Sequence, residues 1–180
     1  MIAHRDERLP PRTRRILHLD VDAFLASVEQ ALHPELRIDP DNIYFLGHSQ
    51  GGLTGAIALP WADEVKGWVL SGAGAGVSMT VMQREDPLVI REALRTAVEA
   101  PEETELFDLH PLINLVQTIV EPSDPMNYAP MWVTEAEGPP KSILLTEGIH
   151  DTQTPADTSE ALAIAGGLPI ARPYRERDGF

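Results

Sequence analysis

The 180-residue sequence contains no cysteine and no long apolar run. Without cysteine, the chain can form neither disulfides nor thiolate metal sites. No stretch of about 18 apolar residues is present to span a membrane. The charged, proline-interrupted start offers no apolar segment that could serve as an export signal. We therefore expect no membrane span, no signal peptide and, by default, a cytoplasmic location.

Basic residues are scarce, because 14 Lys and Arg stand against 28 Asp and Glu, for a formal net charge of −14. This balance argues against a nucleic-acid partner, since such proteins gain most of their affinity from Lys and Arg at phosphates. The charge is also uneven: residues 1–37 are net zero, whereas residues 38–180 carry the whole −14. The shift predicts two domains that meet near Arg37, the first with a basic leader.

The order of apolar segments and turn residues is typical of an α/β protein with a parallel sheet. The stretch from residue 75 to 140 differs, because it contains helical patterns and a proline-rich segment and no strand pattern. An insertion of this length between two strands predicts a helical cap. The predicted strands cover 15–21, 43–46, 67–71 and 142–146, and the predicted helices cover 22–33, 51–60, 87–100 and 110–120. A last helix follows the loop that begins at Asp151, and Gly166 and Gly167 end it.

One short motif carries recognisable chemistry. Gly47-His48-Ser49-Gln50-Gly51 fits G-x-S-x-G, and it lies between the apolar strand "IYFL" and a segment compatible with a helix. In such a nucleophile elbow a serine occupies a strained turn, and glycine neighbours let the backbones approach closely. The alternative is a glycine-rich turn without catalytic function.

A second motif follows the last predicted strand of residues 38–180. The segment "GIHDTQTP" places Asp151 in a loop at the carboxyl end of that strand. A carboxylate at this position can orient a histidine beside the serine. The alternative is an Asx-turn, or a cap for the helix that follows.

From Ile38 to about Pro173 the chain resembles an α/β-hydrolase of the lipase and esterase kind. The resemblance rests on "GHSQGG", the strand "VLSGAG", the long insertion and "TEGIHDTQTP". It implies Ser49 as the nucleophile, the backbone N–H of Gln50 as an oxyanion donor and Asp151 as the acid. It also implies a small-molecule acyl or lipid-like substrate and no cofactor.

The base that this family requires is not identified by the sequence. The family places a histidine after the acid, but no histidine follows His150. The six histidines are His4, His18, His33, His48, His110 and His150. His48 is a poor substitute, because adjacent residues at a strand end point apart. Few strands precede the elbow, so we expect an incomplete sheet whose open edges favour self-association.

Residues 13–37 resemble the opening of a Y-family translesion DNA polymerase. The matching residues are H-x-D-x-D-x-F from His18 to Phe24, followed by "ASVE" and "HPEL". The resemblance implies that Asp20 and Asp22 bind a catalytic Mg²⁺. Leu25 stands where the family usually has an aromatic residue. The family also has an adjacent Asp-Glu pair that follows a serine, whereas Asp63 and Glu64 of this chain follow Trp61 at the serine position. Solvated acids at a strand end are the alternative explanation.

Three hypotheses follow. The first is a serine hydrolase with an incomplete or weak catalytic site. The second is a polymerase remnant or accessory that depends on Mg²⁺. The third is a non-catalytic composite fragment that joins pieces of the two families. In the first hypothesis, apolar residues of the cap contact an acyl chain of the substrate, and the alternative is that they belong to the core. These residues are "LINLVQTIV", Met126, Met131 and Trp132.

Overall fold

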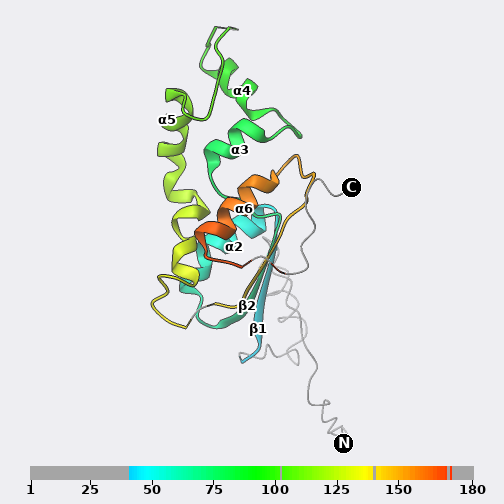
Figure 1. The fold of residues 1–180 in the computed structure, drawn as a ribbon, viewed down its shortest axis with the longest axis vertical. Helices are drawn as coiled ribbons and strands as arrows, with labels where there is room; N and C mark the ends of the chain where they lie inside the picture. The colour runs from blue at the N-terminus through cyan, green and yellow to red at the C-terminus, as the bar shows by residue number, and fades with distance from the viewer. Residues whose placement is uncertain (1–40, 102, 140, 170, 172–180) are drawn as a thin grey trace, which may run out of the picture.

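The computed structural model describes residues 41–101, 103–139, 141–169 and 171. The strand and helix predicted within residues 15–33 lie outside this part of the chain, as do Asp20, Asp22 and the boundary near Arg37. The described residues form an α/β fold built on a three-stranded parallel sheet (Figure 1). The predicted fold class, a parallel sheet interrupted by a helical insertion, is therefore confirmed.

The sheet consists of β1 (Ile43–His48), β2 (Val65–Ser71) and β3 (Ile143–Thr146), in that spatial order. The register aligns the carboxyl ends of all three strands. His48 of β1 lies opposite Ser71 of β2, and Ser71 lies opposite Thr146 of β3. The loops that leave the three strands therefore begin side by side, and these loops contain both motifs identified in the sequence.

Two helices pack close to the sheet and follow its strands in the chain. Helix α2 (Gln50–Ala58) continues from the turn after β1 and ends in the 3₁₀ turn η1 (Leu59–Trp61). Helix α6 (Ala156–Ala165) follows the loop after β3. The close packing of α2 on β1 requires a small residue at Gly55, where a Cβ would lie 2.3 Å from Cε1 of Phe45.

The insertion between β2 and β3 contains three helices, α3 (Val77–Gln83), α4 (Ile90–Ala97) and α5 (Pro111–Val120). Three short 3₁₀ turns follow α5 in the proline-rich segment: η2 (Glu121–Ser123), η3 (Pro125–Asn127) and η4 (Ala129–Trp132). Figure 1 shows α3 and α4 at the end of the molecule toward which the strands run. Helices α3 and α4 thus lie beyond the carboxyl ends of the strands, whereas the end of the insertion packs into the core beside the sheet.

A single core joins the sheet, its helices and the end of the insertion. Its fully buried side chains include Leu59, Leu70, Trp132 and Leu162, and burial of each large apolar side chain stabilises the fold by about 1.5–3 kcal/mol. The indole N–H of Trp132 donates to the carbonyl oxygen of Ala56 at 3.1 Å, which joins η4 to α2. Trp132 is therefore a core residue.

Asp124 ties the start of α3 to the proline-rich segment. Its buried carboxylate accepts hydrogen bonds from the backbone N–H groups of Gly76, Val77 and Met126, each at 3.0 Å, and from Nε2 of Gln117 at 2.9 Å. Burial by itself raises the pKa of Asp124. The hydrogen bonds from Gln117 and from the three backbone groups outweigh burial, and they hold the pKa below its ordinary value of 3.8.

Most of the predicted elements in the described residues are confirmed, but several bounds differ and one helix was not predicted. Strand β2 begins at Val65, two residues before the predicted start. Helix α4 is shorter than the predicted 87–100, and α3 was not predicted. One face of β1 is partly open among the described residues, because Tyr44 is 45% exposed. Within the same residues, no helix has the length and apolarity needed to cross a bilayer.

Candidate functional site

The turn between β1 and α2 holds Ser49 in a strained backbone conformation. Its φ is 50° and its ψ is −118°, a combination that residues with a Cβ rarely adopt and that costs about 1–3 kcal/mol. Two backbone hydrogen bonds hold this conformation. The Ser49 N–H donates to the carbonyl oxygen of Ser71 at 2.9 Å, and the Leu53 N–H donates to the carbonyl oxygen of Ser49 at 3.0 Å.

The two glycines of the motif have different roles in the turn. A Cβ on Gly47 would lie 2.4 Å from the carbonyl oxygen of Gly51 and 2.6 Å from Cε1 of Phe45. Only glycine fits there without displacing the backbone of α2. A Cβ on Gly51 would have no described atom within 4 Å. The close approach expected of both glycines is therefore present at Gly47, and the described residues do not require it at Gly51.

The serine side chain and the following N–H group lie at the start of α2. Ser49 is half-buried, and its hydroxyl does not cap the helix. The backbone N–H of Gln50 belongs to the first turn of α2, where N–H groups have no intrahelical partner. An N–H group at this position can donate to a bound oxygen, and the helix dipole favours negative charge there.

Asp151 lies in the loop after β3. Its Oδ1 accepts hydrogen bonds from the backbone N–H groups of Gln153 and Thr154, both at 2.8 Å. This is the Asx-type arrangement that the sequence left open as an alternative. Its Oδ2 lies 3.8 Å from the position that a Cβ on Gly72 would occupy. Because Gly72 follows Ser71, which binds the Ser49 backbone, Asp151 and the elbow lie at the same end of the sheet.

Among the described residues, no hydrogen bond between a histidine ring and the Ser49 hydroxyl is found. The Nδ1 atom of His48 lies 3.2 Å from Oγ of Ser71, so its ring contacts the neighbouring strand. His110 belongs to the insertion, where its Nδ1 accepts a hydrogen bond from the Leu112 N–H at 3.1 Å. His150 is exposed in the loop beside Asp151. The other three, His4, His18 and His33, lie outside the described residues.

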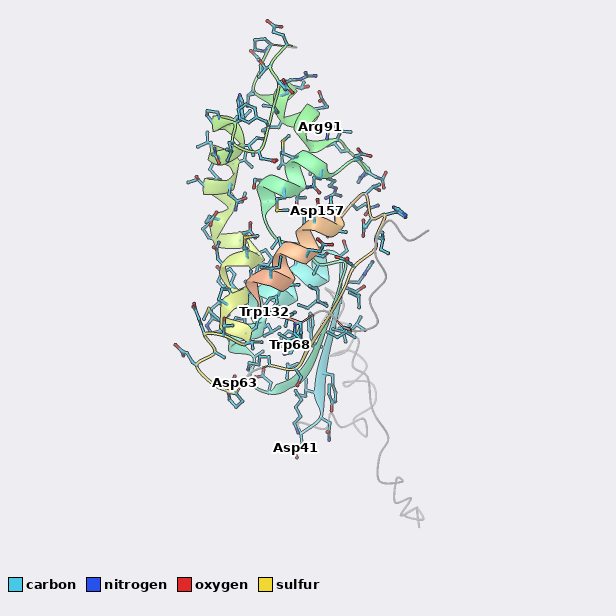
Figure 2. The ribbon with its side chains drawn as sticks, in the orientation of Figure 1. Asp41, Asp63, Trp68, Arg91, Trp132 and Asp157 are labelled. Atoms are coloured by element: carbon cyan, nitrogen blue, oxygen red, sulfur yellow. The ribbon has the colours of Figure 1, made fainter. Side chains whose placement is uncertain are left out.

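The apolar residues of the insertion divide between the core and the surface. Trp132 is fully buried and Met126 packs against the core, so both stabilise the fold. Leu115 and Ile119, one helical turn apart on α5, are 56% and 70% exposed. Figure 2 shows Trp132, at the end of the insertion, near Trp68 of β2, whereas Arg91 of α4 lies far from both. The residues predicted to contact an acyl chain therefore do not form one surface.

The described residues contain no group of three or more His, Asp or Glu side chains placed to hold a metal ion. The adjacent acids Asp63 and Glu64 lie in the loop before β2. Oδ1 of Asp63 lies 2.5 Å from Nζ of Lys141, so this carboxylate joins the start of β2 to the start of β3. Nothing in this part of the chain supports the polymerase resemblance, and Asp20 and Asp22 lie outside it.

Comparison with known proteins gives a limited set of similarities. No family model and no curated protein matches the chain. Among solved structures, it is similar to a puromycin-hydrolysing peptidase of Mycobacterium tuberculosis, with a TM-score of 0.49 and 20% identity over 80% of this chain and 19% of that one. It is also similar to an acylaminoacyl peptidase of Pyrococcus horikoshii, with a TM-score of 0.47 and 18% identity over 80% of this chain.

The chain spans about a fifth of the length of each of these peptidases, 19% of one and 20% of the other. The α/β assignment rests on the sheet and helices described above. A functional assignment has to rest on the geometry around Ser49.

Proposed function

We propose that this protein is a serine hydrolase in which Ser49 attacks an ester or another acyl substrate. The conformation of Ser49 carries the proposal. A serine held at φ 50° between a parallel strand and a helix is costly, and backbone strain of this kind is concentrated at functional sites. A glycine-rich turn without a function would relieve that cost by placing glycine at position 49.

The neighbouring groups support the same chemistry. The N–H of Gln50 is placed to donate to the oxyanion that forms when Ser49 attacks a carbonyl carbon. Asp151 enters from the end of β3, two strands away from β1, and its Oδ2 faces the strand ends. The reaction is acyl transfer from the substrate to Ser49, followed by hydrolysis of the acyl-enzyme by water.

The base is the missing component of this site. A serine hydroxyl is a weak nucleophile until a histidine accepts its proton. Since no described histidine is hydrogen-bonded to the Ser49 hydroxyl, a histidine outside the described residues or from a partner chain would complete the site. Without such a base, the oxyanion donor and substrate binding alone give a residual acceleration of about 10³–10⁴ over water.

The test is the hydrolysis of p-nitrophenyl acetate and butyrate by the full chain and by two variants. Ser49→Ala removes the nucleophile, and Ser123→Ala, at an exposed serine of η2, is the matched control. We expect Ser49→Ala to lower kcat/KM at least tenfold and Ser123→Ala to leave it unchanged. Equal turnover by the Ser49→Ala variant, or no turnover by the unmodified chain, would overturn the proposal and favour the non-catalytic hypothesis.

A further inference from the structure

A second serine lies beside a histidine at the end of the sheet. Oγ of Ser71 and Nδ1 of His48 are 3.2 Å apart, within the range of a nucleophile–base hydrogen bond. The two residues are direct partners in the parallel register of β1 and β2, so the sheet itself places them together. His48 is exposed and Ser71 is half-buried, which leaves the pair accessible to small molecules.

Asp151 and His48 both lie beside Gly72. The position of a Cβ on Gly72 lies 3.6 Å from Cε1 of His48 and 3.8 Å from Oδ2 of Asp151. The absence of a side chain at Gly72 leaves the space between imidazole and carboxylate open. Oδ1 of Asp151 is held by two backbone N–H groups, and this fixes the carboxylate with Oδ2 toward that space.

We propose that Ser71, His48 and Asp151 form a second serine site, in which Ser71 reacts with fluorophosphonates. The arrangement contains a hydroxyl, an imidazole at hydrogen-bond distance from it and a carboxylate beside the same glycine as the imidazole, and these are the three kinds of group that activate a serine nucleophile. The site goes beyond the function proposed for Ser49, because the reacting oxygen belongs to another strand and has a histidine in contact with it.

The chemical step follows from the tautomer of His48. When the ring is neutral with its proton on Nε2, the Ser71 hydroxyl donates to the unprotonated Nδ1. With a fluorophosphonate, the Ser71 oxygen bonds to phosphorus, fluoride leaves with its bonding electron pair, and the hydroxyl proton moves to Nδ1. The positive imidazolium is stabilised by the nearby Asp151 carboxylate, and His48 then releases the proton to solvent.

The experiment treats the full chain with a fluorophosphonate probe and maps the modified serines by peptide mass spectrometry. In the Ser49→Ala variant we expect the label on Ser71, and in the variant with both serines replaced by alanine we expect none. His48→Asn in the Ser49→Ala background is the matched control for activation. Asparagine retains a hydrogen-bonding group near the position of Nδ1 but cannot accept the proton, so we expect labelling of Ser71 to slow at least tenfold.

Two results would overturn the proposal: no label on Ser71 in a folded Ser49→Ala protein, or labelling of Ser71 that is undiminished by His48→Asn. If Ser49→Ala does not fold, Ser49→Gly provides the same background, because glycine tolerates a positive φ. Labelling of Ser49 in the Ser71→Ala variant reports on the function proposed for Ser49 alone. The failures of the two proposals are therefore distinguishable.

Discussion

The backbone N–H of Ser49 donates a hydrogen bond of 2.9 Å to the carbonyl oxygen of Ser71. Gly72, which follows Ser71, donates its N–H to the carbonyl oxygen of Thr146, also at 2.9 Å. These two bonds continue the pairing of the three strands beyond their ends. The strained turn at Ser49 and the loop of Asp151 are therefore held by the same sheet, and a change that alters the register of the strands would separate them.

Gly47 and Gly51 provide a matched test of the close approach at the elbow. Gly47→Ala would place a Cβ 2.4 Å from the carbonyl oxygen of Gly51 and displace the start of α2. We expect a loss of about 1–3 kcal/mol in the free energy of unfolding, measured by urea denaturation. Gly51→Ala meets no described atom, and alanine favours the helix by about 0.5–1 kcal/mol. Equal effects of the two variants would contradict this account.

Asp124 is expected to contribute strongly to the stability of the insertion. Asp124→Asn replaces one carboxylate oxygen by an NH₂ group, which faces N–H donors that then have no acceptor. Hydrogen bonds to a buried charged group contribute about 1.5–3 kcal/mol each, so we expect a loss of at least about 3 kcal/mol in urea denaturation. The control is Asp108→Asn, at an exposed aspartate. A loss below about 1 kcal/mol for Asp124→Asn would show that the network is not stabilising.

The lowered pKa of Asp124 predicts a specific dependence of stability on pH. The unfolded chain binds a proton at Asp124 near pH 3.8, whereas the folded chain binds it only at lower pH. The stabilisation is therefore fully present above about pH 4 and is lost as the pH falls through the folded pKa. Between pH 6 and pH 2, the difference in urea midpoint between the unmodified chain and Asp124→Asn should narrow as the pH falls below about 4. A constant difference over this range would contradict the prediction.

Two buried tryptophans differ in the partners of their indole N–H groups. That of Trp132 donates to the carbonyl oxygen of Ala56, whereas that of Trp68 has no acceptor in the part of the chain that the structure describes. Trp132→Phe and Trp68→Phe remove similar volumes, but only the first leaves a buried carbonyl group without its donor. We expect Trp132→Phe to lower the free energy of unfolding by about 1–2 kcal/mol more than Trp68→Phe. A larger loss for Trp68→Phe than for Trp132→Phe, in thermal and urea denaturation, would contradict this prediction.

The elements next to the sheet were predictable because their signals are local. The apolar runs of β1 and β3, and the glycines that follow α6, are visible in the sequence itself. Helix α3 was not predictable from the sequence, because its first turn is capped by the carboxylate of Asp124, 47 residues away in the chain. Its first residue follows Gly76, which has a φ of 76° and provides no side-chain cap. A helix stabilised by so distant a residue leaves no local pattern.

The candidate site was likewise predictable only where its signals are local. Ser49 and Asp151 were identified from the turns that follow strands, and the structure places both at the carboxyl ends of the sheet. The contact of His48 with Ser71 was missed, since it depends on the register between two strands separated by a helix. The strands "IYFLGHS" and "WVLSG" end in polar residues, and aligning those ends would have suggested the contact.

The central claim is that Ser49 is a reactive nucleophile. Its most direct test is the fluorophosphonate labelling of the full chain in the Ser71→Ala background, with the modified residue identified by peptide mass spectrometry. The account predicts one label for each chain, located on Ser49 and absent from the Ser49→Ala/Ser71→Ala variant. A cooperatively folded Ser71→Ala protein that carries no label on Ser49 after prolonged incubation would contradict it.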